Sequence, residues 1–406
     1  MKRRLNKIYL ISLAVILTIT LYFLPTTVFA TEYTFTTIDV PGADRTVVNG
    51  INDSGSIVGT YYDATGYHGF LYSGGAFTTI NFLNATYANG INNSGDIVGY
   101  GTGPWYHNFL YSGDAFTTID IGDTSWGANG INDSGGIVGA YGDATGRHGF
   151  LYVGGRFTTI DVPGAVDWTV PKGINNSGAI VGIYNYIDAP STHRGFHYSE
   201  GIFTPIDVPG AFNGTDVFGI NDFGDIVGEY YDDSYHNFLY SGGAFATIVV
   251  PGASLTSAYS NAIYGINNSG QIVGYYVDDN SIMHGFVATP IRKSVSIDIK
   301  PGVYPNTIKL GANGSISVAI LTTPDFDALT VDPITVTFAG AAPTKSRKTD
   351  VDSDGDVDLL LYFNTQAMVE LTKDSTVARL TGKTEGEPPL DIIGTDSVNI
   401  VTKGKK

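Results

Sequence analysis

The fold is decided by the stretch GINDSGSIVG, which runs from Gly50 to Gly59. Close copies of it follow every 40 to 46 residues, beginning at Gly90, Gly130, Gly173, Gly219 and Gly265. Each copy is followed by a His shortly before a Phe, and a segment resembling Phe-Thr-Thr-Ile also recurs six times. Repetition at this spacing is the sequence signature of an architecture built from repeated supersecondary units.

Each copy is expected to form four short strands, which we name a to d. In the first copy strand a contains Ile51, strand b begins at Ile57, strand c spans His68–Tyr72 and strand d spans Phe77–Ile80. Glycine-rich turns separate them, since glycine adopts positive φ at little cost. Four strands in a unit of this length are typical of a propeller blade. Residues 31–290 are therefore predicted to form a six-bladed β-propeller.

The phase of the repeat predicts how its ends meet. The chain starts with an unpartnered d strand at Tyr33–Val40, and the last copy stops at a c strand, His284–Ala288. Pairing these two would complete the sixth blade and remove an exposed sheet edge.

Composition limits the classes of partner. The chain has 406 residues, 52 of them glycine, no cysteine, and a formal net charge of −17. Residues 31–290 contain 24 acidic and only five basic side chains. Without cysteine there can be no disulfide framework and no Cys-based metal site. Because phosphate backbones and anionic membranes require basic contacts, nucleic acid and membrane surfaces are poor partners.

The N-terminal segment has the features of an export signal. Four basic residues precede Ile8, an apolar run extends to Leu24, and Val28-Phe29-Ala30 is a small-residue cleavage site. We predict a signal peptide at residues 1–30 and an extracellular or cell-surface location. An uncleaved membrane anchor is the alternative, because the apolar run is long.

The His-to-Phe motif resembles that of the extracellular HAF-repeat family. Its middle Ala is Gly in His68-Gly69-Phe70 and His148-Gly149-Phe150, and the fourth copy carries an insertion, His193-Arg194-Gly195-Phe196. The resemblance covers the six repeats and implies a secreted or surface-exposed protein. It implies no reaction.

The variable b–c and d–a loops are expected to share one face, where binding residues commonly lie. Aromatic rings there would stack on sugar faces while Asn and Asp side chains bind the hydroxyls. The alternative is that these rings fill gaps within or between blades. The candidate ligand-binding residues are Trp105, Tyr106, Trp126, Trp168, Tyr184 and Tyr186.

Two other residue types could carry chemistry. Six histidines recur at the start of strand c, where structural hydrogen bonds are a better interpretation than a shared metal ion. Glu229 replaces an uncharged residue of the other copies and is a weak candidate for catalysis. Glycoside hydrolysis would need a second, facing carboxylate.

A second domain is expected after the repeats, with a linker at residues 291–294 and a β-sandwich at residues 295–406. Its acidic loop resembles the calcium loops of FG-GAP repeats. An EF-hand is excluded, because its twelfth position here is Leu361 rather than Glu. By that resemblance a structural Ca²⁺ would be bound by the side chains of Asp350, Asp352, Asp354 and Asp358 and by the carbonyl of Asp356.

We therefore expect an all-β, secreted or cell-surface binding protein without catalytic activity. Its propeller is predicted to recognise extracellular glycan, or a surface protein, through the variable loops. A carbohydrate-active hydrolase or lyase on the same face is one alternative, and a structural component of a surface layer or matrix is another.

Overall fold

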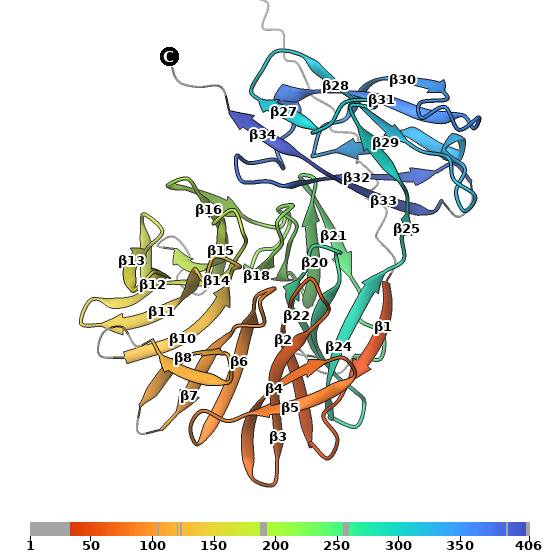
Figure 1. Cartoon of the computed structure of the whole chain (residues 1–406). Coiled ribbons are helices and arrows are strands. Elements are labelled where there is room, and N and C mark those ends of the chain that lie inside the picture. The colour runs from red at the N-terminus through yellow and green to blue at the C-terminus, as the bar shows by residue number, and fades with distance from the viewer. Residues whose placement is uncertain are drawn as a thin grey trace, which may run out of the picture.

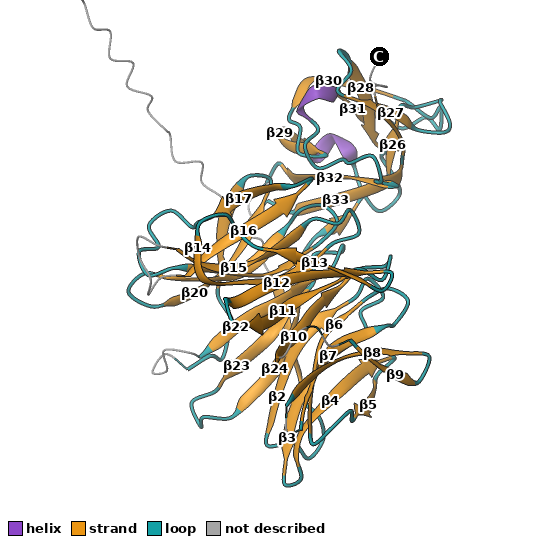
Figure 2. Cartoon of the chain, turned by 90° about the vertical axis from the view of Figure 1, so that its left-hand side faces the viewer, coloured by secondary structure: helices purple, strands orange, loops and turns teal. Residues whose placement is uncertain are grey.

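The computed structural model describes residues 33–103, 105–119, 121, 124–186, 193–254, 260–386 and 389–402. The predicted signal peptide at residues 1–30 lies outside these ranges. Among the described residues, strands form almost all the regular structure (Figure 2), with two short 3₁₀ helices, η1 (Ala328–Thr330) and η2 (Thr365–Ala367). Within the same residues, no helix has the length and apolar character needed to cross a membrane.

The repeat region contains six four-stranded units. The first three are β2 (Arg45–Ile51), β3 (Ile57–Asp63), β4 (Gly66–Ser73) and β5 (Ala76–Ile80); β6 (Ala85–Ile91), β7 (Ile97–Thr102), β8 (Tyr106–Ser112) and β9 (Ala115–Thr118); and β10 (Thr124–Ile131), β11 (Ile137–Asp143), β12 (Gly146–Val153) and β13 (Arg156–Ile160). The others are β14 (Ala165–Ile174), β15 (Ile180–Tyr186), β16 (His193–Ser199) and β17 (Ile202–Ile206); β18 (Thr215–Ile220), β19 (Ile226–Tyr231), β20 (Tyr235–Ser241) and β21 (Ala244–Ile248); and β22 (Asn261–Ile266), β23 (Ile272–Val277), β24 (Met283–Pro290) and β1 (Tyr33–Ile38).

The sixth unit takes its outer strand from the start of the chain. In the first five units, consecutive strands pair antiparallel in chain order. In the sixth, β24 pairs antiparallel with β1, from Tyr33 opposite Pro290 to Ile38 opposite Gly285. This pairing confirms the one predicted from the phase of the repeat.

Apolar positions of the motif fill a core on each side of every unit. In the first copy Ile57 packs in a cluster with Phe70 and with Val273 of the sixth unit. The adjacent Val58 faces the other way and packs with Ile91 of the second unit. This alternation follows from the two-residue period of a strand, and it explains why the motif carries Ile and Val side by side. The Phe of the His-to-Phe motif is at most 1% exposed in all six copies.

The glycine before the Ile of each copy allows neighbouring a strands to come close together. A Cβ atom built on Gly50 would lie 2.8 Å from the carbonyl oxygen of Asn89 in the next unit. Glycine is therefore required by contact between units as well as by turn geometry.

The C-terminal strands form two four-stranded sheets and a pair. One sheet is ordered β25 (Lys293–Ser294), β33 (Asp391–Ser397), β32 (Val377–Thr384), β29 (Val331–Phe338), and the other β26 (Ile297–Ile299), β28 (Ser315–Ile320), β31 (Asp358–Asn364), β30 (Pro343–Thr349); β27 (Thr307–Leu310) pairs with β34 (Asn399–Thr402). A single apolar cluster joins the two larger sheets, with Phe338 and Phe363 in contact. β25 lies within the predicted linker.

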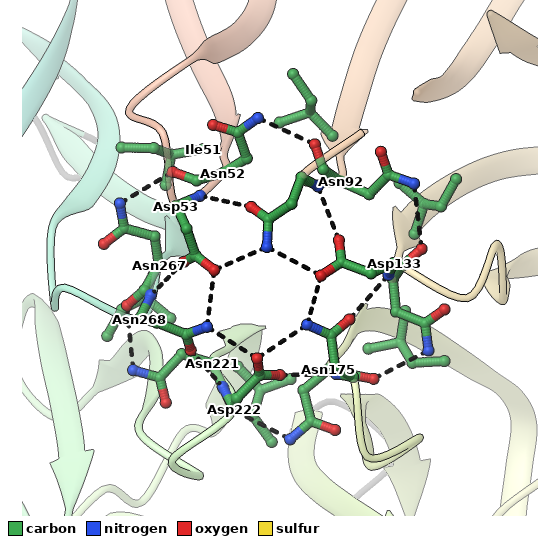
Figure 3. A pocket seen from close by; sticks show the side chains of 18 residues that line it. Ile51, Asn52, Asp53, Asn92, Asp133, Asn175, Asn221, Asp222, Asn267 and Asn268 are labelled. Carbon is green, nitrogen blue, oxygen red and sulfur yellow. Dashed lines mark hydrogen bonds between the residues drawn. The ribbon is translucent and has the colours of Figure 1, made fainter. Parts of the chain in front are cut away.

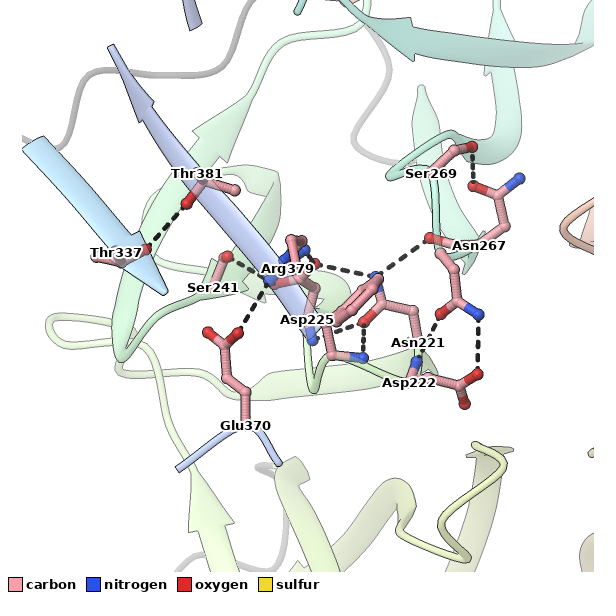
Figure 4. A network of polar contacts seen from close by, with 12 residues as sticks. Asn221, Asp222, Asp225, Ser241, Asn267, Ser269, Thr337, Glu370, Arg379 and Thr381 are labelled. Atoms are coloured by element: carbon pink, nitrogen blue, oxygen red, sulfur yellow. Dashed lines mark hydrogen bonds and ion pairs between the residues drawn. The ribbon is translucent and has the colours of Figure 1, made fainter. Parts of the chain in front are cut away.

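The C-terminal strands lie against one side of the repeat region (Figure 1). Arg379 of β32, only 5% exposed, donates hydrogen bonds to both carboxylate oxygens of Asp225 in the fifth unit. Its guanidinium carbon lies 4.4 Å above the ring of Phe223, and Glu370 is 3.7 Å from its other side (Figure 4). Burial alone would raise the pKa of Asp225, but Arg379 holds it at about 2. The contact is made at an a–b turn. These residues therefore do not cover the opposite side, where the b–c loops lie.

Candidate functional site

The six a–b turns converge on a narrow central cavity of about 70 Å³ (Figure 3). We call this side of the repeat region the turn end. The Asn of each Gly-Ile-Asn copy accepts hydrogen bonds from its own turn and donates one to a carbonyl of the next unit. The donations run in sequence through Asn52, Asn92, Asn132, Asn175, Asn221 and Asn267, and Asn267 donates to the carbonyl of Asn52 at 3.0 Å. The amide ring, as we name these six residues, thus returns to its starting point.

A second ring is formed by the residues that follow these asparagines. Around it Asp and Asn alternate: Asp53, Asn93, Asp133, Asn176, Asp222 and Asn268. Each Asn side chain donates one N–H to the carboxylate on either side, at 2.8 to 2.9 Å. The two N–H groups of each amide match the two hydrogen bonds that the Oδ2 of each carboxylate accepts, so every side chain is satisfied only if the two types alternate.

A larger pocket of about 460 Å³ lies at the other side, where the b–c loops begin. We call this side the loop end and the cavity the axial pocket. Every unit contributes the residue just before its Gly-Ile-Asn motif. These six residues are Asn49, Asn89, Asn129, Lys172, Phe218 and Tyr264. The first three units thus repeat an amide, whereas the last three differ from it and from each other.

Aromatic rings line the first half of the axial pocket. The ring centroids of Tyr67 and Tyr87 are 5.6 Å apart, and those of Tyr87 and Tyr100 are 4.6 Å apart, both stacked. Tyr106 continues the series, 5.8 Å from Tyr100 in an edge contact. Trp126 also lines the pocket and is 51% exposed. Exposed flat apolar surfaces beside amides are therefore present in one cavity.

Two basic residues meet at this pocket. Lys172 lines it, and the guanidinium of Arg147 lies 3.6 Å from the ring centroid of Trp126. Burial lowers the pKa of Lys172, an effect that Asp216 opposes and Arg147 increases. Burial also lowers the pKa of Arg147. Among the described residues neither cation has a carboxylate within ion-pair distance.

The fifth unit places two carboxylates opposite each other. Asp216 of β18 and Glu229 of β19 are direct cross-strand partners, and both line a side cavity of about 240 Å³. Like charges directly opposite destabilise a sheet. Burial, reinforced by Asp216, raises the pKa of Glu229 to about 7. Glu229 is therefore largely protonated at weakly acidic pH.

His193 reaches Asp216 because of the insertion in the fourth copy. The extra residue gives Arg194 the usual histidine position, where it lies 3.8 Å from Asp207. His193 is moved toward the fifth unit, and its Nδ1 lies 3.2 Å from Asp216 Oδ1. This hydrogen bond raises the pKa of His193. Lys172, His193, Asp216 and Glu229 thus form one charged group from two neighbouring units.

Three other histidines of the repeat support the structural interpretation. His68 Nδ1 bonds Asn81 at 2.8 Å, and His148 Nδ1 bonds Asp161 at 2.7 Å. His284 makes the same contact with Asp39, which follows β1, at 2.7 Å. Each joins the c strand to the residue after the d strand of its own unit.

The predicted binding aromatics lie in three separate places. Trp126 lines the axial pocket, Tyr106 lies beside it, and Trp105, 69% exposed, precedes Tyr106. Trp168 instead packs edge-on against His193 at 5.0 Å. Tyr184 and Tyr186 line an outer cavity of about 490 Å³ beside Arg194.

Several placements predicted for these aromatics were wrong. Trp126 and Trp168 lie in strands β10 and β14 rather than in loops, because these a strands begin earlier than the motif suggested. Tyr106 opens β8. Tyr184 and Tyr186 lie in β15, and Tyr184 is only 3% exposed because it packs into an inter-unit core with Phe196.

The acidic loop brings three of its five aspartates together. Asp350, Asp352 and Asp358 each offer an oxygen within 4.8 Å of the others, whereas Asp354 and Asp356 do not belong to this group. Buried Asp358 accepts backbone hydrogen bonds from Thr322 and Val351, both at 2.8 Å, which fixes the end of the loop. Partial burial and the neighbouring Asp354 and Asp358 raise the pKa of Asp352.

Two features of the site escaped the sequence analysis although the sequence carried their signals. The alternation of Asp and Asn after Gly-Ile-Asn was visible in the aligned copies, as was the replacement of Asn49, Asn89 and Asn129 by Lys172. Asp216 was the unnoticed partner of Glu229. Its signal was a charged residue at a position that is uncharged in the other five copies.

Comparisons with known proteins give no family. No family model matches the chain, and no curated protein matches it. Among solved structures it is similar to TolB from Acinetobacter baumannii (10% identity, TM-score 0.43), over 58% of this chain and 64% of that one, which is less than two thirds of TolB's length. It is similar to XC5397, a gluconolactonase from Xanthomonas campestris (11% identity, TM-score 0.41), over 64% of this chain and 90% of that one. A third similar structure is the β-propeller domain of the Trilobed protease from Pyrococcus furiosus (10% identity, TM-score 0.38), matched over 61% of this chain and 94% of that one.

Proposed function

We propose that the chain is a secreted or cell-surface protein that binds extracellular glycan in the axial pocket without chemically changing it. The observation that carries the proposal is the combination of stacked tyrosines, exposed Trp126 and three amides in one cavity of about 460 Å³. Sugar rings present apolar C–H faces for aromatic stacking and hydroxyls for amide hydrogen bonds. The excess of acidic residues argues against nucleic acid as the ligand.

The architecture we infer is a closed six-bladed β-propeller followed by a β-sandwich. Three observations support closure: the pairing of β1 with β24, the core shared by Val273 and Val48, and the bond from Asn267 to Asn52. The alternating ring of Asp and Asn also limits the number of units. Asp and Asn can alternate around a ring without a mismatch only if the number of units is even, and six copies satisfy this.

Binding can be tested with the mature protein on an array of neutral and acidic oligosaccharides, followed by calorimetry. Trp126→Ala should weaken binding roughly tenfold or more, since exposed aromatic anchors dominate such sites. Tyr186→Ala, in the outer cavity, is the matched control and should leave affinity unchanged. The proposal would be contradicted if the wild-type protein bound no saccharide, or if Trp126→Ala left its saccharide affinity unchanged.

We also propose that the acidic loop binds a structural Ca²⁺. Three convergent carboxylates and a loop rich in backbone oxygens suit a hard cation. Thermal unfolding of the C-terminal domain should shift upward with Ca²⁺ in the wild type but not in Asp352→Ala. Heat of Ca²⁺ binding that persists in Asp352→Ala would reject this site.

Hydrolysis of a glycosidic bond is a second candidate, favoured by the facing carboxylates. Glu229, protonated near neutral pH, could donate its proton to the leaving oxygen while Asp216 takes a proton from attacking water. The bond from the anomeric carbon to that oxygen would break. Glu229→Gln should then abolish release of reducing ends but retain binding, whereas the binding-only proposal predicts no release by the wild type.

A further inference from the structure

We propose that the axial pocket selects acidic glycans, whose carboxylate or sulfate groups are bound by Lys172 and Arg147. This inference rests on the proposed glycan function and names the ligand class. Basic side chains are gathered at one end of a strongly acidic domain, and this distribution of charge is unexpected.

The placement of the two cations runs against the composition of the domain. Residues 31–290 contain five basic side chains among 24 acidic ones, yet two of the five meet at this pocket. Lys172 occupies the position that is Asn49, Asn89 and Asn129 in the first three units. Those amides donate to a carbonyl of the next unit, Asn129 to Pro171 at 2.8 Å, so the structural role of this position does not require a charge.

Both cations adjoin Trp126, since Lys172 lines the same pocket and Arg147 lies over the Trp126 ring. Arg147 increases the depression of the Lys172 pKa that burial causes, as a neighbouring positive charge does. No described carboxylate lies within ion-pair distance of either group. In contrast, Arg194 of the same domain has Asp207 at 3.8 Å, and Arg379 is held by Asp225. Unpaired neighbouring cations cost free energy that an anionic ligand would recover.

The acids beside the pocket do not cancel this charge. Asp216 is the carboxylate that raises the Lys172 pKa, but it already accepts a hydrogen bond from His193. Glu229 has a pKa of about 7, and the pKa of His193 is raised. At pH 6 Glu229 is therefore mostly uncharged, and the raised pKa of His193 favours its cationic form.

The negative charge of the rest of the domain does not prevent such binding in physiological salt. At that ionic strength the screening length is about 8 Å, so charges on remote faces act weakly on a ligand in the pocket. Contacts inside the pocket are screened much less. Electrostatic complementarity at the contact then decides which ligand is selected.

The test measures affinities of the mature protein for neutral, uronic-acid and sulfated oligosaccharides of equal length, by calorimetry at pH 6 and 0.15 M salt. We expect acidic oligosaccharides to bind roughly tenfold tighter than neutral ones, with the carboxylated and sulfated sets showing which anion fits. Lys172→Asn introduces the residue of the first three units, so the variant should fold. It should lower the affinity for acidic oligosaccharides far more than the affinity for neutral ones, and so remove most of this preference.

Arg156→Asn is the matched control, because it removes an exposed cation outside the pocket and should change nothing. Equal wild-type affinities for neutral and acidic sugars would overturn this inference and leave the glycan proposal standing. An equal loss of affinity for neutral and acidic oligosaccharides in Lys172→Asn would also overturn it. Failure of every saccharide to bind would overturn both proposals together.

Discussion

The two ends of the central axis are built from the same six repeats. One end keeps the same residue in every unit, whereas the other end varies it. At the turn end every unit supplies the same asparagine, and the amide ring is buried and fully bonded. At the loop end the corresponding residues are three amides, a lysine and two aromatics around a cavity of about 460 Å³. At the turn end the residues that conform to the repeat join the units, whereas at the loop end three conforming amides and three residues that break the pattern line the cavity.

The docking contact with the C-terminal domain is also made where a residue departs from the repeat. Phe223 and Asp225 lie in the a–b turn of the fifth unit, where Phe223 replaces the Ser found in the other five copies. Both contact Arg379 of β32. A departure from an otherwise repeated turn therefore marks a specific contact, here with another domain.

The largest expected loss of stability comes from breaking this contact. Asp225→Ala should destabilise the protein by about 3 to 5 kcal/mol, because it removes both hydrogen bonds of buried Arg379 to a carboxylate and leaves only the longer contact with Glu370. The shift is measured by urea unfolding at pH 7. Asp96→Ala is the control, since Asp96 accepts the same bond from its own turn, from Asn92, without binding Arg379. Equal losses in the two variants would contradict a docking role.

The amide ring should be the next most sensitive feature. Asn132→Ala removes buried bonds to Gly136 and to the carbonyl of Asn175 and should cost about 3 kcal/mol. Asp133→Ala, in the exposed alternating ring, should cost less. Urea midpoints compare the two directly. A loss for Asn132→Ala no larger than that for Asp133→Ala would show that the buried ring does not join the units.

Glu229→Gln should stabilise the protein, but only at high pH. The folded-state pKa is about 7, above its ordinary value, so folding binds this proton more tightly and the associated stability is lost as pH rises through 7. The variant should gain roughly 2 kcal/mol at pH 8.5 and nothing below pH 4.5. Glu200→Gln, at an exposed turn, controls for the loss of one negative charge. A pH-independent gain would mean that Glu229 is not held protonated in the fold.

Trp105→Ala should have the smallest effect and so define the edge of the site. The side chain is 69% exposed, and its loss should change stability by less than about 0.5 kcal/mol. Saccharide affinity, measured beside that of Trp126→Ala, should fall far less than in that variant. An equal fall would extend the binding site outward along the loop that contains Trp105.

Much of the strand pattern could be predicted because repetition averages out local ambiguity. Gly-Ile-Asn and Ile-Val-Gly located strands a and b six times, and the phase of the copies gave the pairing of β1 with β24. The C-terminal domain has no repeats, and β30 (Pro343–Thr349) there carries no comparable signal. Its polar, mostly exposed sequence carries no apolar alternation, as is common for an edge strand.

The site was less predictable because it depends on contacts between units. The sequence drew attention to Glu229 and Trp126, but not to Asp216, His193 and Lys172 as their neighbours. These residues meet through cross-strand register, a one-residue insertion and convergence at the axis, and none of these can be read from a single copy. Tyr184 was misplaced for a related reason: its burial is decided by packing against a neighbouring unit.

Hydrogen exchange with and without a bound oligosaccharide tests the central claim most directly, because it reports which backbone segments a ligand protects. We predict added protection in β6, β7, β10 and the segment around Lys172, with no change at the a–b turns around Asn52 and Asn132. Protection confined to those turns or to the C-terminal domain would contradict the claim that the residues breaking the repeat form the binding site.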